Sequence, residues 1–203
     1  MSYHIKLCPE KYYHLFSRAN GSEKLFKTDE NYEFFLSKLQ FHVSCVADVL
    51  AWCLLPNHFH LLIHVKSEKF ISESYQKIKQ KPLIDNELLP DFIMERFSNL
   101  LNSYTKAFDK VYYRKGALFM DYLRRVEIKD EPQLLATLFY VHKNPVHHNL
   151  CHLIEDWKWS SYNGLINNRS IHCDEVMKWF SGKEAFIDFH QQPIFLKNAV
   201  IVE

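Results

Sequence analysis

Two histidines and a tyrosine are the residues of this 203-residue chain whose types and spacing best suit chemistry. His58 and His60 stand at alternate positions of a predicted strand, so both project from one face and can reach one metal ion. Tyr140 and Asn144 are four residues apart in a predicted helix, so they share one of its faces. This combination suits metal-assisted attack by a tyrosine on a phosphodiester.

The expected metal is a divalent ion, Mg²⁺ or Mn²⁺. Neutral imidazoles with an amide or carboxylate oxygen leave coordination positions open for phosphate oxygens. His64 shares the face of His58 and His60 and is an alternative to Asn144 as the third ligand. Without a metal, the same strand face is a partly solvated sheet surface. A further histidine tract has no compact tetrahedral spacing and is better explained as a solvated turn: His142, His147, His148 and His152.

Hydrophobic periodicity predicts the elements that must position these residues. Apolar runs predict strands over residues 12–18, 46–55, 58–65 and 117–128, and helical spacing predicts helices over residues 29–43 and 93–108. The polar stretch 66–90 interrupts this pattern and is interpreted as a partly ordered insertion. The order is βαββαβ, which is typical of a ferredoxin-like α+β fold with an antiparallel sheet and helices on one face.

A further helix is predicted to carry Tyr140. Its start signal is Asp130 as N-cap, Pro132 in the first turn and Gln133 three residues after the cap. It should end near Asn144, because the residue before a proline is disfavoured from helical conformation. Its apolar stripe lies on the side away from Tyr140 and Asn144 and consists of Leu134, Leu135, Leu138 and Val141. On this helix alone, a half-exposed surface tyrosine is the simpler interpretation.

Composition bounds the class of protein. With 47% hydrophobic and 15% aromatic residues, the chain can bury a core and fold as one domain with an extension. The formal net charge of +1 is too small to indicate a nucleic-acid partner, which would need local clusters of Lys and Arg. Five cysteines without a CxxC pair argue against a disulfide framework or a tetrathiolate zinc site. We expect a cytoplasmic protein, because no apolar run approaches the roughly 18 residues that span a bilayer.

Four ordered motifs carry a resemblance to a known family. They are residues 55–62 (Leu-Pro-Asn-His-Phe-His-Leu-Leu), 116–119 (Gly-Ala-Leu-Phe), 140–146 (Tyr-Val-His-Lys-Asn-Pro-Val) and 157–162 (Trp-Lys-Trp-Ser-Ser-Tyr). Together they resemble the single-tyrosine HUH transposases, and within them the REP-associated tyrosine transposases. The resemblance covers about residues 12–162. The expected transposase-like domain is therefore 1–165, with a C-terminal extension over 166–203 that packs on it.

The resemblance implies specific roles for the histidines and the tyrosine. His58 and His60 look like the HUH metal ligands, Asn144 like the third ligand position and Tyr140 like the nucleophile. Since a phenol with a pKa of about 10 is a poor nucleophile at neutral pH, a divalent metal must make the phosphate more electrophilic. The resemblance further implies a 5′-phosphotyrosine intermediate, a single-stranded or hairpin DNA substrate and a homodimer.

Basic residues that follow the second core helix are candidates for contacts with DNA phosphates. They are Arg114, Lys115, Arg124 and Arg125. Tyr122 stands where related sequences usually carry a basic residue, so DNA contacts there are expected to be rearranged. Tyr104 and Phe108 interleave with lysines, as in base-stacking surfaces, but they are better explained as core positions of the helix.

Two other functions fit the same residues. One is a non-catalytic ferredoxin-like nucleic-acid binder, and the other is a metal-dependent hydrolase that uses the histidines without Tyr140. The substitution Tyr140→Phe separates the three functions. Only a transposase-type enzyme would lose a covalent DNA adduct while it keeps its binding of DNA.

Overall fold

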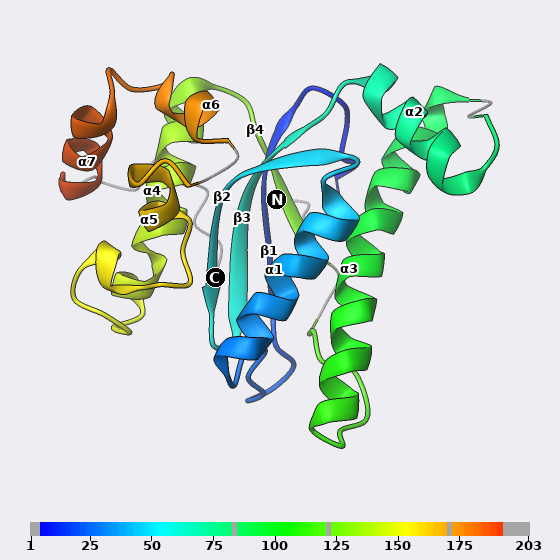
Figure 1. The fold of residues 1–203 in the computed structure, drawn as a ribbon, viewed down its shortest axis with the longest axis horizontal. Helices are drawn as coiled ribbons and strands as arrows, with labels where there is room; N and C mark the ends of the chain where they lie inside the picture. Colours follow the sequence, from blue (N-terminus) through cyan, green and yellow to red (C-terminus); the bar gives the residue numbers. More distant parts are fainter. Residues whose placement is uncertain (1–4, 83–84, 121–122, 170–171, 193–203) are drawn as a thin grey trace.

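The structure, a computed structural model, describes residues 5–82, 85–120, 123–169 and 172–192 (Figure 1). Its strands are β1 (Tyr12–Arg18), β2 (Ala47–Leu55), β3 (His58–Val65) and β4 (Arg124–Ile128). Its α-helices are α1 (Asp29–Val43), α2 (Glu68–Lys79), α3 (Leu89–Val111), α4 (Glu131–His147), α5 (Tyr162–Ile166), α6 (Cys173–Met177) and α7 (Lys183–Gln191), with short 3₁₀ helices η1 (Asn86–Leu88) and η2 (Ile154–Asp156). Apart from α2 and η1, the order through β4 is the predicted βαββαβ.

The strands β1 to β4 form one antiparallel sheet in the order β2-β3-β1-β4. β1 lies between β3 and β4, with Phe16 opposite both His60 and Arg124. Because side chains alternate along a strand, this register brings the even-numbered residues of β1 and β3 to the same face of the sheet. The predicted α+β class with an antiparallel sheet is confirmed.

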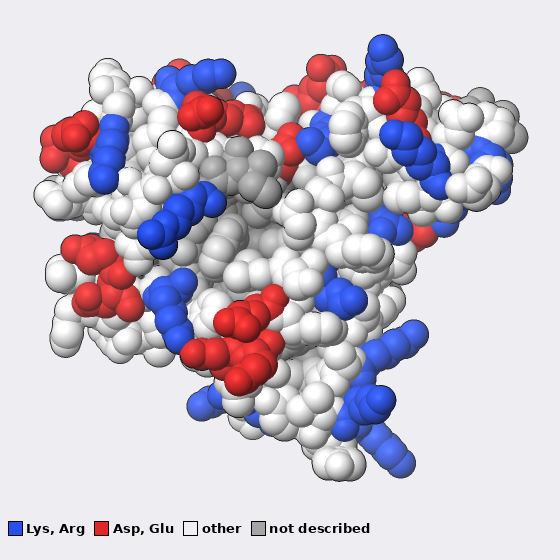
Figure 2. All heavy atoms as spheres, in the orientation of Figure 1, with Lys and Arg blue, Asp and Glu red and all other residues white. Residues whose placement is uncertain are grey.

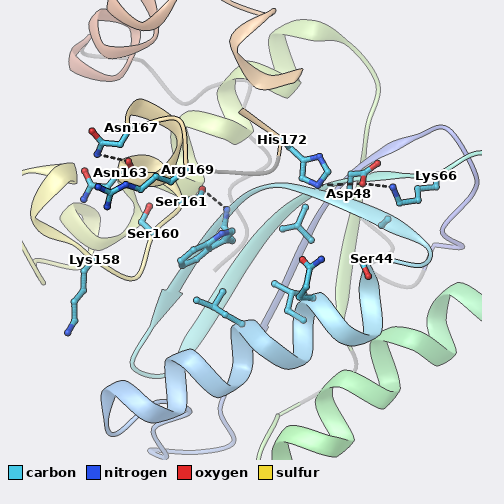
Figure 3. Close-up of a pocket in the computed structure, with 17 residues that line it drawn as sticks. Ser44, Asp48, Lys66, Lys158, Ser160, Ser161, Asn163, Asn167, Arg169 and His172 are labelled. Carbon is cyan, nitrogen blue, oxygen red and sulfur yellow. Dashed lines mark hydrogen bonds and ion pairs between the residues drawn. The ribbon is translucent and has the colours of Figure 1, made fainter. Parts of the chain in front are cut away.

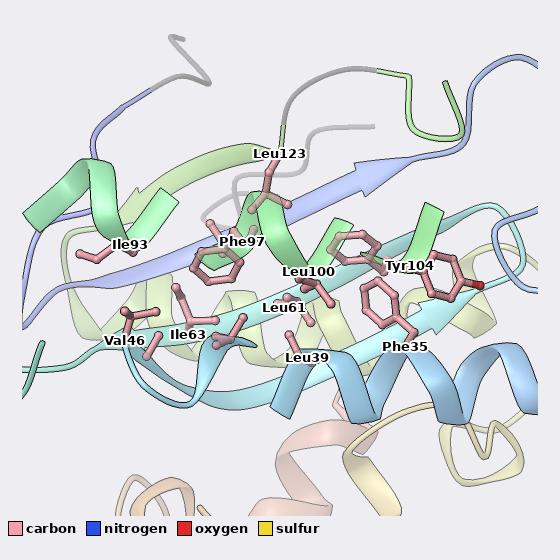
Figure 4. Close-up of a cluster of buried hydrophobic side chains, with 14 of the residues drawn as sticks. Phe35, Leu39, Val46, Leu61, Ile63, Ile93, Phe97, Leu100, Tyr104 and Leu123 are labelled. Carbon is pink, nitrogen blue, oxygen red and sulfur yellow. The ribbon is translucent and has the colours of Figure 1, made fainter. Parts of the chain in front are cut away.

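Helices α1 and α3 cover one face of the sheet and enclose the larger hydrophobic core (Figures 1 and 4). The odd-numbered residues of β3 belong to this core, among them Leu61 and Ile63, which are fully buried. Figure 4 shows them against side chains of the two helices, including Phe35, Leu39, Phe97 and Leu100. Tyr104 and Phe108 are 1% and 2% exposed, which confirms them as core positions of the helix.

Helix α4 and the C-terminal helices cover the other face of the sheet (Figure 1). Leu138 of α4 is fully buried there in a second hydrophobic cluster, together with Leu62 of β3 and Phe186 of α7. The prediction of helices on one face therefore holds for the βαββαβ core only, and the whole chain has helices on both faces. The physical reason is that β2 also places apolar side chains, such as Leu50 and Leu55, on the second face, which must be covered as well.

Helix α4 runs past the boundary that the sequence predicts. It continues through Pro145 to His147 instead of ending near Asn144. A proline near the end of a helix removes only one of its backbone hydrogen bonds. The chain then leaves the helix in an ordered turn, in which the N–H of His148 donates to the carbonyl of Asn144 at 3.0 Å and the N–H of Leu150 donates to that of Pro145 at 2.9 Å.

The last strand and the polar stretch 66–90 also depart from the sequence pattern. β4 begins at Arg124 rather than at residue 117, because Gly116 turns the chain with a φ of +97° and Phe119 makes only an isolated bridge to the residue after β1. Within 66–90, α2 forms behind Ser67, whose Oγ accepts a backbone N–H of the first turn at 3.4 Å. None of the helices in the described ranges is long and apolar enough to cross a membrane.

Candidate active site

The two histidines of the HUH-like motif open β3 and lie close together. His58 is half-buried and His60 is 3% exposed. Their ring centroids are 5.1 Å apart, and the rings are nearly perpendicular, at 88°. The expectation that alternate strand positions bring the two imidazoles together is confirmed, and both lie on the sheet face that α4 covers.

Helix α4 brings Tyr140 and Asn144 to these histidines, as their spacing predicts. Asn144 Oδ1 lies 3.0 Å from His58 Nε2. The Tyr140 ring centroid lies 5.2 Å from that of His60, with the rings edge to face at 83°. Tyr140 is only 2% exposed, so its interpretation as a half-exposed surface side chain is wrong. The reason is that α4 is enclosed between the sheet and the C-terminal helices (Figure 1).

His64, the alternative third ligand, is turned to other partners. Its ring stacks on Tyr12 at a centroid distance of 4.4 Å, and its Nδ1 lies 3.9 Å from a carboxylate oxygen of Glu175 in α6. Asn144 therefore approaches the histidine pair, and no described contact brings His64 to it. Of the other histidine tract, His148 does come near the site, with its ring centroid 4.7 Å from that of His58.

His14 is a member of this cluster that the sequence did not single out. It lies on β1, is 1% exposed, and its Nε2 is 3.0 Å from Nδ1 of His60. Its ring also meets that of Tyr140 edge to face, at a centroid distance of 5.8 Å. Its even number places it on the same strand face as Phe16, but only the pairing of β1 with β3 reveals its contact with His60.

Burial keeps the imidazoles of His14 and His60 neutral. It lowers the pKa of His14 to about 3. Burial, followed by the neighbouring His14 and then His58, lowers the pKa of His60 well below its usual value. A neutral imidazole has a lone pair to give to a metal, whereas an imidazolium has none. At neutral pH these side chains are therefore in the protonation state that metal binding requires.

The residues present fit a divalent metal. His58, His60 and Asn144 offer imidazole nitrogens and an amide oxygen, a donor set that leaves positions open for phosphate oxygens. Nδ2 of Asn144 is buried and makes no hydrogen bond with any described residue, so it could donate to an incoming phosphate. Within the described ranges, no three or more His, Cys, Asp or Glu side chains cluster as a metal site, so the fit depends on the Asn144 amide.

Of the four basic DNA candidates, Arg124 lies on the sheet face of the histidines and Lys115 is exposed. Arg124 is half-buried and lies opposite Phe16, on the sheet face that carries the histidines. Lys115 is exposed after α3. Arg18, which the sequence did not single out, is exposed directly opposite His58 in the sheet, and its Nε donates to Met120 Sδ at 3.0 Å. Tyr122 lies outside the described residues.

The other two candidates are not brought to the histidines. Arg125 lies on the opposite sheet face, is 8% exposed, and has its Nη1 2.6 Å from Met94 Sδ. Burial also lowers its pKa. Arg114 is bound by carboxylates on both sides of its guanidinium, Glu23 at 3.0 Å and Asp109 at 2.7 Å. Neither side chain offers a free cation beside the tyrosine in this structure.

Charged side chains of both signs are mixed over the face shown in Figure 2, in keeping with the net charge of +1. Lys and Arg gather around the lower part of α3 on this face. Any DNA surface must therefore be local, and the end of α3 with Lys115 is one such region.

A cavity of about 710 Å³ opens beside β2, between α1 and the segment that follows α4 (Figure 3). Its lining includes Trp52, Lys158 and Lys66, and Lys66 Nζ lies 2.5 Å from an Asp48 carboxylate oxygen. The described lining residues do not include the histidine pair, Tyr140 or Asn144. This cavity is therefore separate from the candidate active site.

Comparisons with known proteins agree with the family resemblance that the sequence motifs indicate. No protein-family model matches the chain. It is 24% identical over 119 residues to a protein of Haemophilus influenzae named "Putative REP-associated tyrosine transposase". That match covers 57% of this chain, and the chain spans 59% of the length of that relative. The fold is similar to a solved structure described as a REP-associated tyrosine transposase bound to a REP hairpin, with a TM-score of 0.60 and 13% identity, over 82% of this chain and 86% of that one.

The sheet, its helices and the structural match define an α+β protein with the fold of a tyrosine transposase. The resemblance to the family of REP-associated tyrosine transposases, which four sequence motifs indicate, is confirmed by the match in sequence, and the solved structure has the same fold.

Proposed function

We propose that this protein is a metal-dependent endonuclease and strand transferase for single-stranded DNA, with Tyr140 as its nucleophile. The observation that carries the proposal is the meeting of α4 with β3, where Tyr140 and Asn144 contact the histidine pair. This arrangement gathers a phenol, an amide and two imidazoles in one cluster, the groups that metal-assisted attack on a phosphodiester needs. The likeness to transposases in sequence and fold supports the same function.

In this proposal His58, His60 and Asn144 hold a Mg²⁺ or Mn²⁺ ion. When bound, such an ion polarises the scissile phosphate and neutralises the charge that develops on it. The Tyr140 oxygen attacks the phosphorus, an O–P bond forms to the 5′ side of the cut, and the bond to the 3′ oxygen breaks. The phenol gives up its proton, and the departing 3′ oxygen takes one up. Attack by a free 3′-hydroxyl on the phosphotyrosine reverses these bond changes and joins a strand.

Burial of the site serves this chemistry. Tyr140 and His60 are 2% and 3% exposed, so little water reaches them. Exclusion of water strengthens the electrostatic contacts of the site and protects a phosphotyrosine linkage from hydrolysis. The retained linkage conserves the energy of the cut bond for the joining step, so no external energy source is needed.

We propose hairpin or single-stranded repeat DNA as the substrate, because the similar solved structure is described as bound to a REP hairpin. Arg124 and Arg18 stand beside the histidines on the sheet and are the first candidates for its phosphates.

A homodimer belongs to the same proposal and rests on the family resemblance alone. The mass of the protein in solution, measured by light scattering, should then correspond to two chains, and a single-chain mass would contradict it.

The test is a covalent adduct. Protein incubated with single-stranded hairpin DNA and Mn²⁺ should give a denaturant-resistant complex whose peptide map places the link on Tyr140. Tyr140→Phe should abolish the adduct and keep DNA binding, whereas Tyr113→Phe, at a tyrosine that is 96% exposed, should leave it unchanged. An adduct that persists in Tyr140→Phe or maps to Tyr112 or Tyr122 would mean a different nucleophile. DNA binding without any adduct in the unmodified protein would favour a non-catalytic binder.

A further inference from the structure

The contact between His14 and His60 is a feature of the site that the proposed chemistry does not yet use. His14 Nε2 lies 3.0 Å from His60 Nδ1, and the two rings are nearly parallel, at 26°. Both side chains are buried, at 1% and 3% exposed. Water therefore cannot easily replace either partner, and the two imidazoles must satisfy one another.

We propose that His14 is a positioning residue for the metal site, which accepts a hydrogen bond from His60 Nδ1–H and so keeps His60 Nε2 unprotonated as a ligand. This inference rests on the proposed function, because it assigns His60 as a metal ligand. Metal-binding histidines commonly donate their other ring N–H to a neighbouring acceptor, which fixes the tautomer and the orientation of the ring. Here the acceptor is a second histidine.

Proton counting gives this contact only one arrangement that permits metal binding. In the neutral form that metal binding requires, each imidazole carries one N–H. Only one proton fits between His14 Nε2 and His60 Nδ1. If His14 supplied that proton, His60 would carry its own proton on Nε2 and could not bind a metal there. Metal binding through His60 Nε2 therefore requires His60 to donate and His14 to accept.

The packing around His14 holds it in this role. Phe16, two residues along β1, lies 5.1 Å from it between ring centroids, and the Tyr140 ring meets it edge to face at 5.8 Å. The pairing of β1 with β3 fixes the distance between His14 and His60. Phe16 lies directly opposite His60, and His14 is two residues from Phe16 on the same strand face. His14 thus couples the metal ligand and the nucleophile through one buried ring.

The test compares two substitutions of His14 with one control substitution in the 203-residue chain. Mn²⁺ is titrated in the absence of DNA, and free Mn²⁺ is measured by its EPR signal. His14→Phe keeps an aromatic ring but removes the acceptor, and should weaken Mn²⁺ binding about 10- to 100-fold. His14→Gln places an amide oxygen where Nε2 stood, and should restore most of the affinity. His152→Phe changes an exposed histidine outside the site and should bind Mn²⁺ as the unmodified protein does.

Equal Mn²⁺ affinity in His14→Phe and the unmodified protein would overturn the proposal, as would an affinity in His14→Gln no better than that of His14→Phe. Circular dichroism of each variant shows whether it is folded. Should His14→Phe fail to fold, NMR of the unmodified protein still decides. Long-range ¹H–¹⁵N correlations of the metal-free protein should show His60 protonated on Nδ1 and unprotonated on Nε2, and the reverse tautomer would refute the inference.

These outcomes separate the inference from the proposed function. If the unmodified protein binds Mn²⁺ with the expected His60 tautomer but forms no DNA adduct, the catalytic proposal fails and the role of His14 stands. If the adduct forms on Tyr140 but His60 carries its proton on Nε2, the function stands and the role of His14 fails. Failure of the unmodified protein to bind Mn²⁺ would overturn both.

Discussion

Asn144 shows how one side chain can serve two partners at this site. Its Oδ1 lies 3.0 Å from His58 Nε2, while its Nδ2 is buried and makes no hydrogen bond with any described residue. An unsatisfied buried donor costs about 1–3 kcal/mol. That cost is reasonable where a ligand completes the site, because a metal can take the amide oxygen and a phosphate oxygen can accept from the nitrogen.

We expect Asn144→Ala to affect metal binding more than stability. The substitution removes a proposed metal ligand, so Mn²⁺ affinity should fall by at least about tenfold. It loses one hydrogen bond but also an unsatisfied donor, so the free energy of unfolding should change by less than about 1.5 kcal/mol. Mn²⁺ titration and urea unfolding of the same variant measure the two effects. Unchanged affinity with a large loss of stability would show that Asn144 is a structural residue.

Local spacing could place each pair of candidate site residues on one face, His58 and His60 by strand alternation and Tyr140 with Asn144 by the helical turn. Their roles come from the family resemblance and not from spacing. His14 could not be found in this way, because its contact with His60 depends on which strands pair and in which register. Strand alternation does show that adjacent arginines cannot both face one site, and the structure buries Arg125 on the other face.

At the scale of elements, a chain of buried hydrogen bonds ties α4 to the sheet and to α7. The backbone N–H of Trp52 in β2 donates to Ser161 Oγ at 2.9 Å, and this oxygen lies 2.9 Å from His142 Nε2 in α4. His142 Nδ1 is 2.9 Å from His190 Nε2, and His190 Nδ1 is 2.8 Å from the carbonyl of Phe186. His142 and His190 are 0% and 2% exposed.

The two ends of this chain assign its protons. The Phe186 carbonyl can only accept, so His190 donates from Nδ1 and accepts at Nε2. His142 must then donate from Nδ1, accept at Nε2 from the Ser161 hydroxyl, and leave the Ser161 oxygen to accept from the backbone of β2. Both histidines are neutral and every group is satisfied. Sequence spacing suggested a solvated turn for His142, which is wrong because α4 is buried on this side as well.

We expect His190→Ala to destabilise the protein. The substitution leaves the His142 Nδ1–H buried without an acceptor. It also removes a ring whose centroid lies 4.3 Å from that of Phe186. The free energy of unfolding should therefore fall by about 1–3 kcal/mol or more. His190→Gln, whose amide oxygen can accept from His142, should lose less. His152→Ala, at an exposed histidine, should be neutral within about 0.5 kcal/mol. Urea unfolding at pH 7.5 measures all three, and equal stability of His190→Ala and His152→Ala would contradict the hydrogen-bond chain.

At the scale of the whole molecule, the sheet separates two hydrophobic cores that differ in composition. The core beneath α1 and α3 is almost entirely apolar, whereas the face beneath α4 combines apolar residues with the histidines of the site. Periodicity predicted the strands and helices that enclose the first core and their βαββαβ order along the chain. The placement of α5 to α7 could not be predicted, because their short helices carry little periodic signal and pack through long-range contacts such as Phe186 against Tyr162. The C-terminal helices therefore help to hold α4, the helix that carries Tyr140, in place.

This arrangement predicts that the protein loses stability in mild acid. Burial lowers the pKa of His190 to about 4, so the folded protein keeps this ring neutral while the unfolded chain protonates it below about 6.5. Because the unfolded state then binds more protons, the free energy of unfolding should be level above pH 6.5 and fall by about 1.4 kcal/mol per pH unit for this histidine between pH 6.5 and 4. Urea unfolding at pH 7.5 and 5.0 should show this loss. The loss in the free energy of unfolding from pH 7.5 to pH 5.0 should be smaller by about 2 kcal/mol in His190→Gln and unchanged in His152→Gln. An equal loss in the unmodified protein and both variants would show that His190 is not held neutral by the fold.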